Sequence, residues 1–368
     1  MEHNTIEETL NGIISSALKA HASDIHIDPG ENSITVFFRI DGTLNLHNYF
    51  PLSMHEGIII RIKVLARLRV DDNRLPKDGR FKWQGSEGQC VEVRVSMMPT
   101  SYGENAVLRL FDPLVSAYSL KELGFTEEHS YSIEKALTYH SGIIMLVGPT
   151  GSGKTTTLYS LLHHLKKTSR LIITVEDPVE RRIEGVRQIE VGGTTFLEYV
   201  TVLRSIVRQD PDVIMIGEIR DKESAELAIQ AALTGHLVIT TLHTASVFQI
   251  KKRLMYMGIS EFMIDATLIS AASQRLVMKI CPRCKVEDVP VADYEKYFVL
   301  EHLHRPKNIY KGAGCEHCKG TGFEGRIVVS ELLEEGLPLY VDAFRKASLG
   351  LIPFSEVMVA HNEYRHEV

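Results

Sequence analysis

Residues 148–155 read GPTGSGKT and directly follow the apolar run GIIMLV at 142–147. The stretch fits the pattern G-x-x-x-x-G-K-[ST], and the helical run TTTLYSLLHHL comes after it. Glycines let such a loop curl so that backbone N–H groups point at phosphate oxygens, and the following helix adds its dipole. We therefore predict a nucleotide-binding loop between a strand and a helix, with a chance glycine-rich turn as the alternative.

Two side chains of this loop have distinct predicted roles. Lys154 is expected to meet the β- and γ-phosphates, and the Thr155 hydroxyl is expected to hold Mg²⁺. ATP and Mg²⁺ are thus the predicted ligands. The predicted nucleotide-binding residues are Gly148, Pro149, Thr150, Gly151, Ser152, Gly153, Lys154, Thr155 and Thr156.

Short apolar runs alternate with helical segments from about residue 125 onward. These runs are IIMLV, LIITV, VIMI and LVITTL. Continuous apolar strands of this kind suit a parallel sheet covered on both faces by helices. Each run ends in polar or glycine residues, which is where ligands bind in an open α/β sheet. We predict an α/β domain over 125–280.

Acidic residues follow two of these strands. Glu218 comes just after VIMIG, and Glu176 and Asp177 follow LIITV. A nucleotide hydrolase needs carboxylates to position Mg²⁺ and to activate water. We predict that Glu218 is the general base and a Mg²⁺ ligand, and that Glu176 helps to place the water and the metal. The alternative for either residue is a solvated turn.

Two histidines flank the strand LVITTL. His236 precedes it and His243 follows it. We predict that both lie where a γ-phosphate could be sensed. The alternative is that each is a structural residue.

The first part of the chain has a different pattern. Apolar residues alternate in SITVFFRI, and Asp41-Gly42 supplies the positive-φ pair of a tight hairpin. Helical spacing recurs in GIIIRIKVLARL, and strands resume in QCVEVRVSMMPT. We predict a small α+β domain over 1–113 and a linker over 114–124.

Four of the five cysteines form two C-x-x-C pairs, Cys281/Cys284 and Cys315/Cys318. Without an export signal this spacing indicates a metal before a disulfide. Four thiolates satisfy tetrahedral Zn²⁺ and leave no open position, so a structural zinc site is predicted within residues 281–320. The alternative is unpaired reduced thiols. Residues 321–368 are assigned to a C-terminal subdomain.

The overall composition limits the function. The chain is 44% hydrophobic and 24% charged, with a formal net charge of −6. This charge argues against a DNA-coating role. No apolar run approaches the roughly 18–20 residues of a membrane span, so any membrane role is expected to be peripheral.

Four segments together resemble one known family. GPTGSGKTTTLYS, VEDPVE, RQDPDVIMIGEIRD and AALTGHLVITTLHT are similar, in order and spacing, to the four nucleotide motifs of the type II secretion and type IV pilus assembly ATPases. Upstream, ASDIHIDPGENSITVFFRIDG and LPKDGRF resemble the second N-terminal domain of that family. Downstream, KICPRCK and GCEHCKGTGFEGRIVVSELL resemble its tetracysteine element and C-terminal subdomain.

The resemblance implies a fold and a mode of action. The fold is a RecA-like P-loop domain with a parallel-rich sheet, preceded by a small PAS-like α+β domain and followed by a helical C-terminal subdomain. The implied motor is a homo-hexamer, cytoplasmic and peripheral on the inner face of the cell membrane. It drives a polytopic inner-membrane platform protein that extrudes pilin-like subunits, with no direct nucleic-acid binding. In the family's sheet order Glu218 follows the buried strand nearest the phosphate loop.

The start of the chain favours a subtype. The sequence begins directly at the second N-terminal domain, as in the short competence pseudopilus ATPases of Gram-positive bacteria. This leaves the membrane docking partner open.

Three arginines of the small domain complete the predicted site. A γ-phosphate gathers negative charge in the transition state, which guanidinium groups stabilise well, and the large domain offers few arginines near the loop. The resemblance matches Arg80, Arg94 and Arg109 to arginines that swing over the nucleotide when the two domains close. Their alternative is a solvated sheet face.

Other functions remain as alternatives. A pilus retraction ATPase shares the core motifs, but the resemblance implies no tetracysteine insertion there. A nucleic-acid-translocating motor with a zinc ribbon predicts a basic surface with stacking aromatics, which a net charge of −6 and a single Trp disfavour. A non-catalytic ATP-binding scaffold is disfavoured by the intact Lys154, Thr155, Glu176 and Glu218.

Overall fold

The computed structural model describes residues 5–85, 90–111, 118–192, 198–288 and 308–367. The chain divides into two compact units, Met1–Leu114 and Val115–Val368. The first residues of the predicted linker, up to 117, lie outside the described residues, and Leu120–Leu123 form the short helix α3. Among the described helices, none is both long enough and apolar enough to cross a bilayer.

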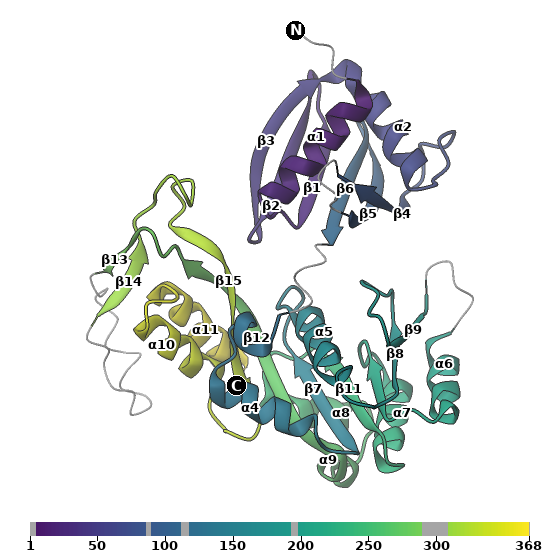
Figure 1. The fold of residues 1–368 in the computed structure, drawn as a ribbon, viewed down its shortest axis with the longest axis vertical. Coiled ribbons are helices and arrows are strands. Elements are labelled where there is room, and N and C mark those ends of the chain that lie inside the picture. The colour runs from purple at the N-terminus through teal and green to yellow at the C-terminus, as the bar shows by residue number, and fades with distance from the viewer. Residues whose placement is uncertain (1–4, 86–89, 112–117, 193–197, 289–307, 368) are drawn as a thin grey trace. The chain divides into compact units, whose positions relative to one another are not determined.

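The N-terminal unit is a six-stranded antiparallel sheet in the order β3-β2-β1-β6-β5-β4, with two helices on one face (Figure 1). Its elements are α1 (Ile6–Lys19), β1 (Asp24–Pro29), β2 (Ser33–Ile40), β3 (Thr43–Pro51), a 3₁₀ turn (Leu52–Met54), α2 (His55–Leu65), β4 (Lys77–Gln84), β5 (Cys90–Thr100) and β6 (Gly103–Phe111). The predicted α+β architecture is confirmed.

Local sequence explains this unit. Asp41 and Gly42 have φ values of 49° and 87°, so the predicted tight turn joins β2 to β3. Alternate residues of β2, such as Ile34 and Val36, are buried, because the opposite face of a strand points away from the core. Helix α1 begins at a capping box in which the Thr5 side chain accepts from the backbone N–H of Glu8.

The larger unit is built on a seven-stranded sheet in the order β15-β12-β7-β11-β10-β8-β9. Every pair is parallel except β12 with β15. Its strands are β7 (Gly142–Val147), β8 (Ile172–Glu176), β9 (Arg187–Glu190), β10 (Val213–Ile216), β11 (Leu237–Leu242), β12 (Leu268–Ile280) and β15 (Phe323–Leu332). Its helices are α4 (Glu127–Ala136), α5 (Lys154–Leu165), α6 (Tyr199–Ile206), α7 (Lys222–Leu233), α8 (Ile250–Tyr256) and α9 (Glu261–Thr267), with 3₁₀ turns at Val207–Gln209 and Val247–Gln249.

Strand β7 is buried on both faces. Ile143, Met145 and Val147 join one hydrophobic cluster, whereas Ile144 and Leu146 join another. Successive strand residues point to opposite faces, so each face of the sheet has its own core. The predicted α/β fold with a parallel-rich sheet is confirmed.

The sheet order corrects one expectation. Strand β11 lies between β7 and β10, so the strand before Glu218 is not the one nearest the phosphate loop. Strand β12, which the sequence pattern did not identify, is the other neighbour of β7. Small and polar residues occupy much of β12, which removes the continuous apolar signal of the other central strands.

The C-terminal part combines two further elements. A two-stranded ribbon, β13 (Lys285–Asp288) with β14 (Ile309–Gly312), extends from the β12/β15 pair, and helices α10 (Leu339–Ser348) and α11 (Phe354–Glu367) follow (Figure 1). Helices α10 and α11 share a cluster with Val277 of β12 and Val329 of β15. Strand β15 falls within the predicted C-terminal subdomain but is an edge strand of the large sheet.

Candidate nucleotide site

The phosphate loop turns between β7 and α5 on glycines. Gly148, Gly151 and Gly153 have φ values of 143°, 81° and 88°, which side chains rarely tolerate. A Cβ at Gly148 would also lie 2.5 Å from the backbone oxygen of Gln274. No side chain caps the first turn of α5, so its amides face the loop as an anion site requires.

Lys154 is folded into this loop and is only 8% exposed. Its Nζ donates to the backbone oxygens of Gly148 and Pro149, at 2.6 and 2.9 Å. Burial lowers the pKa of Lys154, and the nearby charge of Glu218 acts in the opposite direction. The carboxylate of Glu218 therefore acts electrostatically on the lysine of the loop.

Strand β12 supports the loop from its other side. Ser273 is paired with Val147, the residue before the loop. Next to it, Gln274 is fully buried and its Nε2 donates to the backbone oxygen of Ser152 at 2.8 Å. Sequence reasoning missed Gln274, because it belongs to no phosphate motif and lies far from the loop in the chain.

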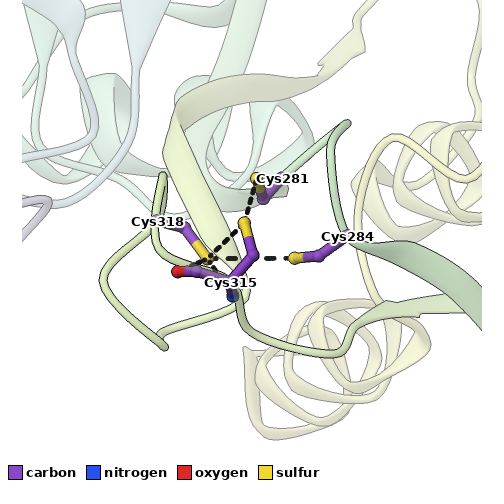
Figure 2. A group of neighbouring side chains, drawn as sticks. All are labelled: Cys281, Cys284, Cys315 and Cys318. Carbon is purple, nitrogen blue, oxygen red and sulfur yellow. Dashed lines mark hydrogen bonds between the residues drawn. The ribbon is translucent and has the colours of Figure 1, made fainter.

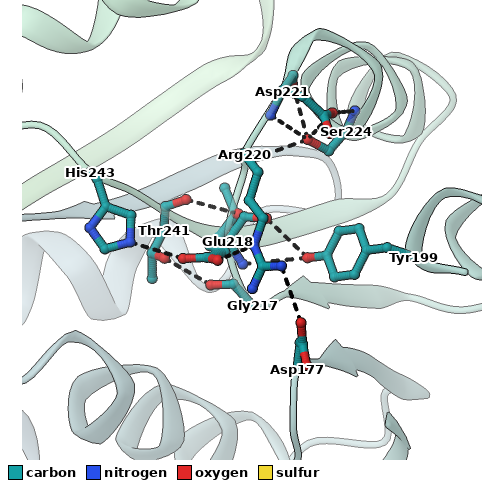
Figure 3. Close-up of polar contacts among 10 residues, drawn as sticks. Asp177, Tyr199, Gly217, Glu218, Arg220, Asp221, Ser224, Thr241 and His243 are labelled. Atoms are coloured by element: carbon teal, nitrogen blue, oxygen red, sulfur yellow. Dashed lines mark hydrogen bonds and ion pairs between the residues drawn. The ribbon is translucent and has the colours of Figure 1, made fainter. Parts of the chain in front are cut away.

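Glu218 is the centre of a polar group at the carboxyl ends of neighbouring strands (Figure 3). Its Oε2 contacts Nε2 of His243 at 2.9 Å, and its Oε1 accepts from Nε of Arg220. Burial raises the pKa of Glu218, but the contacts with His243 and Arg220 outweigh burial and lower it. The carboxylate is thus held ionised. Tyr199 supports it by donating to the backbone oxygen of Glu218 at 3.0 Å.

Arg220 extends the group to a third strand end. Its guanidinium also contacts Oδ2 of Asp177, which follows β8, at 3.1 Å (Figure 3). The group therefore gathers Asp177, Glu218 and His243 from the ends of β8, β10 and β11. Arginines of the large unit also lie in this region: Arg220 contacts Glu218, and the charge of Arg275 adds to burial in lowering the pKa of Lys154.

Glu176 is the last residue of β8, at the predicted strand end, but its carboxylate is buried. It is only 4% exposed, and its carboxylate accepts from Tyr159 Oη at 2.5 Å, Thr174 Oγ1 at 2.5 Å and Gln188 Nε2 at 3.1 Å. Burial and the adjacent Glu176 raise the pKa of Tyr159, so the phenol keeps the proton that it donates. Glu176 is an internal acceptor in this structure and does not join Glu218 and His243.

The prediction for His236 is wrong for a geometric reason. Strands β7 and β11 run parallel, and His236 precedes Leu237, which pairs with Gly142 at the start of β7. The phosphate loop follows the far end of β7. A six-residue strand spans roughly 20 Å, so His236 lies at the opposite edge of the sheet. Its Nδ1 contacts the backbone oxygen of Ala231 at 2.9 Å, within its own turn.

The three predicted arginines of the N-terminal unit form a cross-strand row. Arg80 pairs with Arg94, and Arg94 pairs with Arg109. Arg109 in turn faces Asp24, and its Nε lies 2.8 Å from Oδ1 of that buried carboxylate. Directly opposite residues project from the same face, so the row lies on the face away from α1 and α2. Their contact with a nucleotide stays a prediction.

The four cysteines come together at the end of the β12/β15 pair (Figure 2). The Sγ–Sγ distances are 4.0 Å for Cys281–Cys315, 3.8 Å for Cys284–Cys318 and 3.7 Å for Cys315–Cys318. Zn–S bonds of about 2.3 Å in a tetrahedron give sulfur separations of about 3.8 Å. The thiols therefore fit a zinc ion. Burial raises the pKa of Cys318, but backbone N–H groups of Cys315 and Gly322 outweigh it and lower the pKa to about 6.

Comparison with known proteins agrees with this arrangement. Residues 1–343 match the family model described as type II/IV secretion system protein. The chain is 42% identical over 336 residues to the type IV pilus assembly ATPase TfpB of Acinetobacter baylyi, covering 91% of this chain and 57% of TfpB. It is also 42% identical over 324 residues to a putative type II secretion system protein E of Escherichia coli, covering 88% of this chain and 65% of that protein. The chain belongs to the type II/IV secretion system protein family.

The match to the curated relatives covers only part of their length, and one solved structure shares the fold. The chain spans less than two thirds of the length of these two curated relatives. The X-ray structure of the Legionella pneumophila ATPase DotB has the same fold, with a TM-score of 0.73, 21% sequence identity, and coverage of 99% of this chain and 98% of that chain.

Proposed function

We propose that the protein is an ATP hydrolase that powers assembly of a type IV pilus-like or type II secretion apparatus. The observation that carries this proposal is that the phosphate loop after β7 and the polar group of Glu218, His243 and Arg220 lie at the same edge of the parallel sheet. Membership of the secretion family supports the same activity.

The residues of the loop have the chemistry to bind ATP. Backbone N–H groups of the loop and of the first turn of α5 would donate hydrogen bonds to the phosphate oxygens, and Lys154 would neutralise charge between the β- and γ-phosphates. The bound Mg²⁺ would stabilise charge on the phosphate oxygens, and the Thr155 hydroxyl and Glu218 are the residues that would hold it. Thr155 lies half-buried in the first turn of α5.

Glu218 is the proposed general base. Its lowered pKa keeps the carboxylate ionised and able to take a proton from the attacking water. His243 and Arg220 each contact one of its two oxygens, and the remaining lone pairs of the carboxylate are the ones that would take the proton. Charge that develops on the γ-phosphate would be met by Lys154 and by the arginine row of the N-terminal unit.

The assembly around this site is also a proposal. We infer a homo-hexamer in which ATP draws the N-terminal unit of a subunit over the nucleotide, so that Arg80, Arg94 and Arg109 face the γ-phosphate. The partners would be a polytopic inner-membrane platform protein and, through it, pilin-like subunits. The motor would be cytoplasmic and peripheral on the membrane, with a competence pseudopilus as the proposed system. The four cysteines would carry a structural Zn²⁺.

Phosphate release from ATP tests the hydrolase. We expect Mg²⁺-dependent turnover by the purified chain, and loss of nucleotide binding in Lys154→Ala. The matched control is Lys166→Ala, which removes an exposed lysine at the other end of the same helix. No turnover by the wild-type protein, or unchanged binding in Lys154→Ala, would overturn the proposal. Full activity in a verified monomer would overturn the hexameric part alone.

A further inference from the structure

Glu331 is a buried carboxylate in the C-terminal part of β15, outside every nucleotide motif. It is 2% exposed, and both of its oxygens are used. Oε1 accepts from Ser246 Oγ at 2.5 Å and from the backbone N–H of Val247 at 2.7 Å. Oε2 accepts from the backbone N–H of Leu339 at 2.9 Å. One side chain thus joins two segments that are far apart in the sequence.

The first segment is the loop that carries His243. This loop leaves β11 at His243, whose ring contacts the carboxylate of Glu218. Three residues later, Ser246 and Val247 are fixed by Glu331. Between them, the backbone oxygen of Ala245 accepts from Ser273 Oγ at 2.8 Å. The loop is therefore hydrogen-bonded to β12 and β15 immediately after His243, the residue that contacts Glu218.

The second segment is the start of α10. Leu339 is its first residue, and no side chain of the preceding Pro338 caps it. The Glu331 carboxylate supplies the missing acceptor, and a negative charge at a helix N-terminus is stabilising. Helix α10 belongs to the C-terminal cluster with α11. Glu331 is therefore shared between the loop of His243 and the C-terminal helices.

The phosphate loop is held by the same pair of strands. Glu331 pairs with Ser273 across the β12/β15 ladder, and the next residue, Gln274, donates to Ser152 of the phosphate loop. A shift of β15 would thus move both loops of the nucleotide site together. A buried charge is costly unless its hydrogen bonds are complete, and burial raises the pKa of Glu331. The three donors are therefore needed to stabilise the ionised carboxylate in the interior.

We propose that Glu331 is a positioning residue for hydrolysis: it holds the His243 loop so that His243 stays against Glu218, and it ties that loop to the N-terminus of α10. This inference rests on the proposed ATPase function.

Steady-state ATP hydrolysis with a double-mutant cycle tests the proposal. Glu331→Gln keeps the size of the side chain but presents an NH₂ group to backbone donors. We expect its kcat to fall at least about tenfold while KM for ATP changes less than about twofold. In the His243→Ala background the same substitution should lower kcat by less than about twofold, because Glu331 acts through His243. Glu331→Asp should recover part of kcat.

Two controls separate positioning from general damage. Asp342→Asn alters an equally buried acid, which accepts from the backbone N–H of Ser330 at 2.8 Å and pairs with the ammonium group of Lys346; none of its described hydrogen bonds reaches the His243 loop. Its kcat should stay within about twofold of wild type. If Glu331→Gln fails to fold, Ser246→Ala removes one hydrogen bond of the same clamp, by which we mean Glu331 with its donors on the His243 loop and at Leu339. This variant should lower kcat without changing KM.

Amide hydrogen exchange gives a readout that does not depend on turnover. The amides of Val247 and Leu339 should exchange faster together in Glu331→Gln or Ser246→Ala, and not in Asp342→Asn. A wild-type chain without ATPase activity would refute the proposed function, while the exchange data would still test the clamp. Unchanged kcat in Glu331→Gln and Ser246→Ala, additive effects with His243→Ala, or an equal loss in Asp342→Asn would overturn the inference.

Discussion

Nε2 of His243 lies 2.9 Å from Oε2 of Glu218, so the ends of two adjacent parallel strands meet in one carboxylate–imidazole contact. A second link joins the same strand ends, because Thr241 Oγ1 donates to the backbone oxygen of Gly217 at 2.8 Å. The carboxylate is therefore fixed from both its side chain and its backbone. Such fixation is what a general base needs before substrate arrives.

Hydrolysis should tolerate acid better in the wild type than in Arg220→Met. Burial raises the pKa of Glu218, and His243 and Arg220 lower it below the ordinary value of 4.5. The base stays ionised above that pH and is lost only as the pH falls further. Without Arg220 the effect of burial is opposed less, so the pKa of Glu218 should rise. The decline of kcat on the acid side should then begin at a higher pH. The ratio of kcat at pH 8 to that at pH 5.5 should be higher in Arg220→Met than in the wild type, and an unchanged ratio would contradict this.

Glu176→Gln should affect stability more than chemistry. The substitution leaves Tyr159, Thr174 and Gln188 with a poorer acceptor in the interior. We expect a loss of about 1–3 kcal/mol in the free energy of unfolding. The kcat of the folded protein should fall less than about tenfold. Denaturant unfolding and turnover on the same sample measure both, with the exposed Glu184→Gln as the control. A stable but inactive Glu176→Gln would restore a catalytic role.

The arginine row should govern turnover more than affinity. If Arg94 and Arg109 meet the γ-phosphate, replacing either by Ala should lower kcat at least about 100-fold, because arginines in this role contribute large factors. ATP affinity should change far less. Arg69→Ala is the control, since Arg69 is exposed and paired with Asp71 in the same unit. Wild-type turnover in both row variants would end the proposal that the units close over the nucleotide.

The cysteine cluster should contain one zinc per chain. Elemental analysis of the purified protein measures the metal, and a strong chelator should lower Tm because structural zinc contributes folding energy. Cys284→Ser should lose most of the zinc. The Cys90→Ser variant is the matched control, because Cys90 lies in the N-terminal unit outside the cluster. Much less than one zinc per chain in the wild type would refute the assignment.

The sequence predicted what local rules determine. The phosphate loop, the four apolar strands and the Asp41-Gly42 turn each depend on residues close together in the chain, and all were found. The cysteine cluster was also predicted, because two C-x-x-C pairs carry their own geometry.

Features that depend on distant partners were missed. Glu176 and Glu218 both come at the ends of apolar strands. Nothing in either motif shows that Tyr159 and Gln188 donate hydrogen bonds to Glu176 in the interior. His236 was misplaced because it lies in the same sequence motif as His243, although it comes before β11 and His243 comes after it. The two histidines therefore lie at opposite ends of that strand. The roles of Gln274 and Glu331 arise from strand pairing at long range, which the sequence alone does not specify.

The central claim is that Glu218 is the general base, so that its carboxylate matters far more for hydrolysis than for the affinity for ATP. The most direct measurement compares equilibrium ATP binding and the single-turnover rate of phosphate formation in wild type and Glu218→Gln. The account predicts dissociation constants within about threefold and a rate at least about 100-fold lower in the variant. A Glu218→Gln protein that hydrolyses bound ATP at the wild-type rate, with Glu176→Gln inactive, would contradict the account and exchange the two roles.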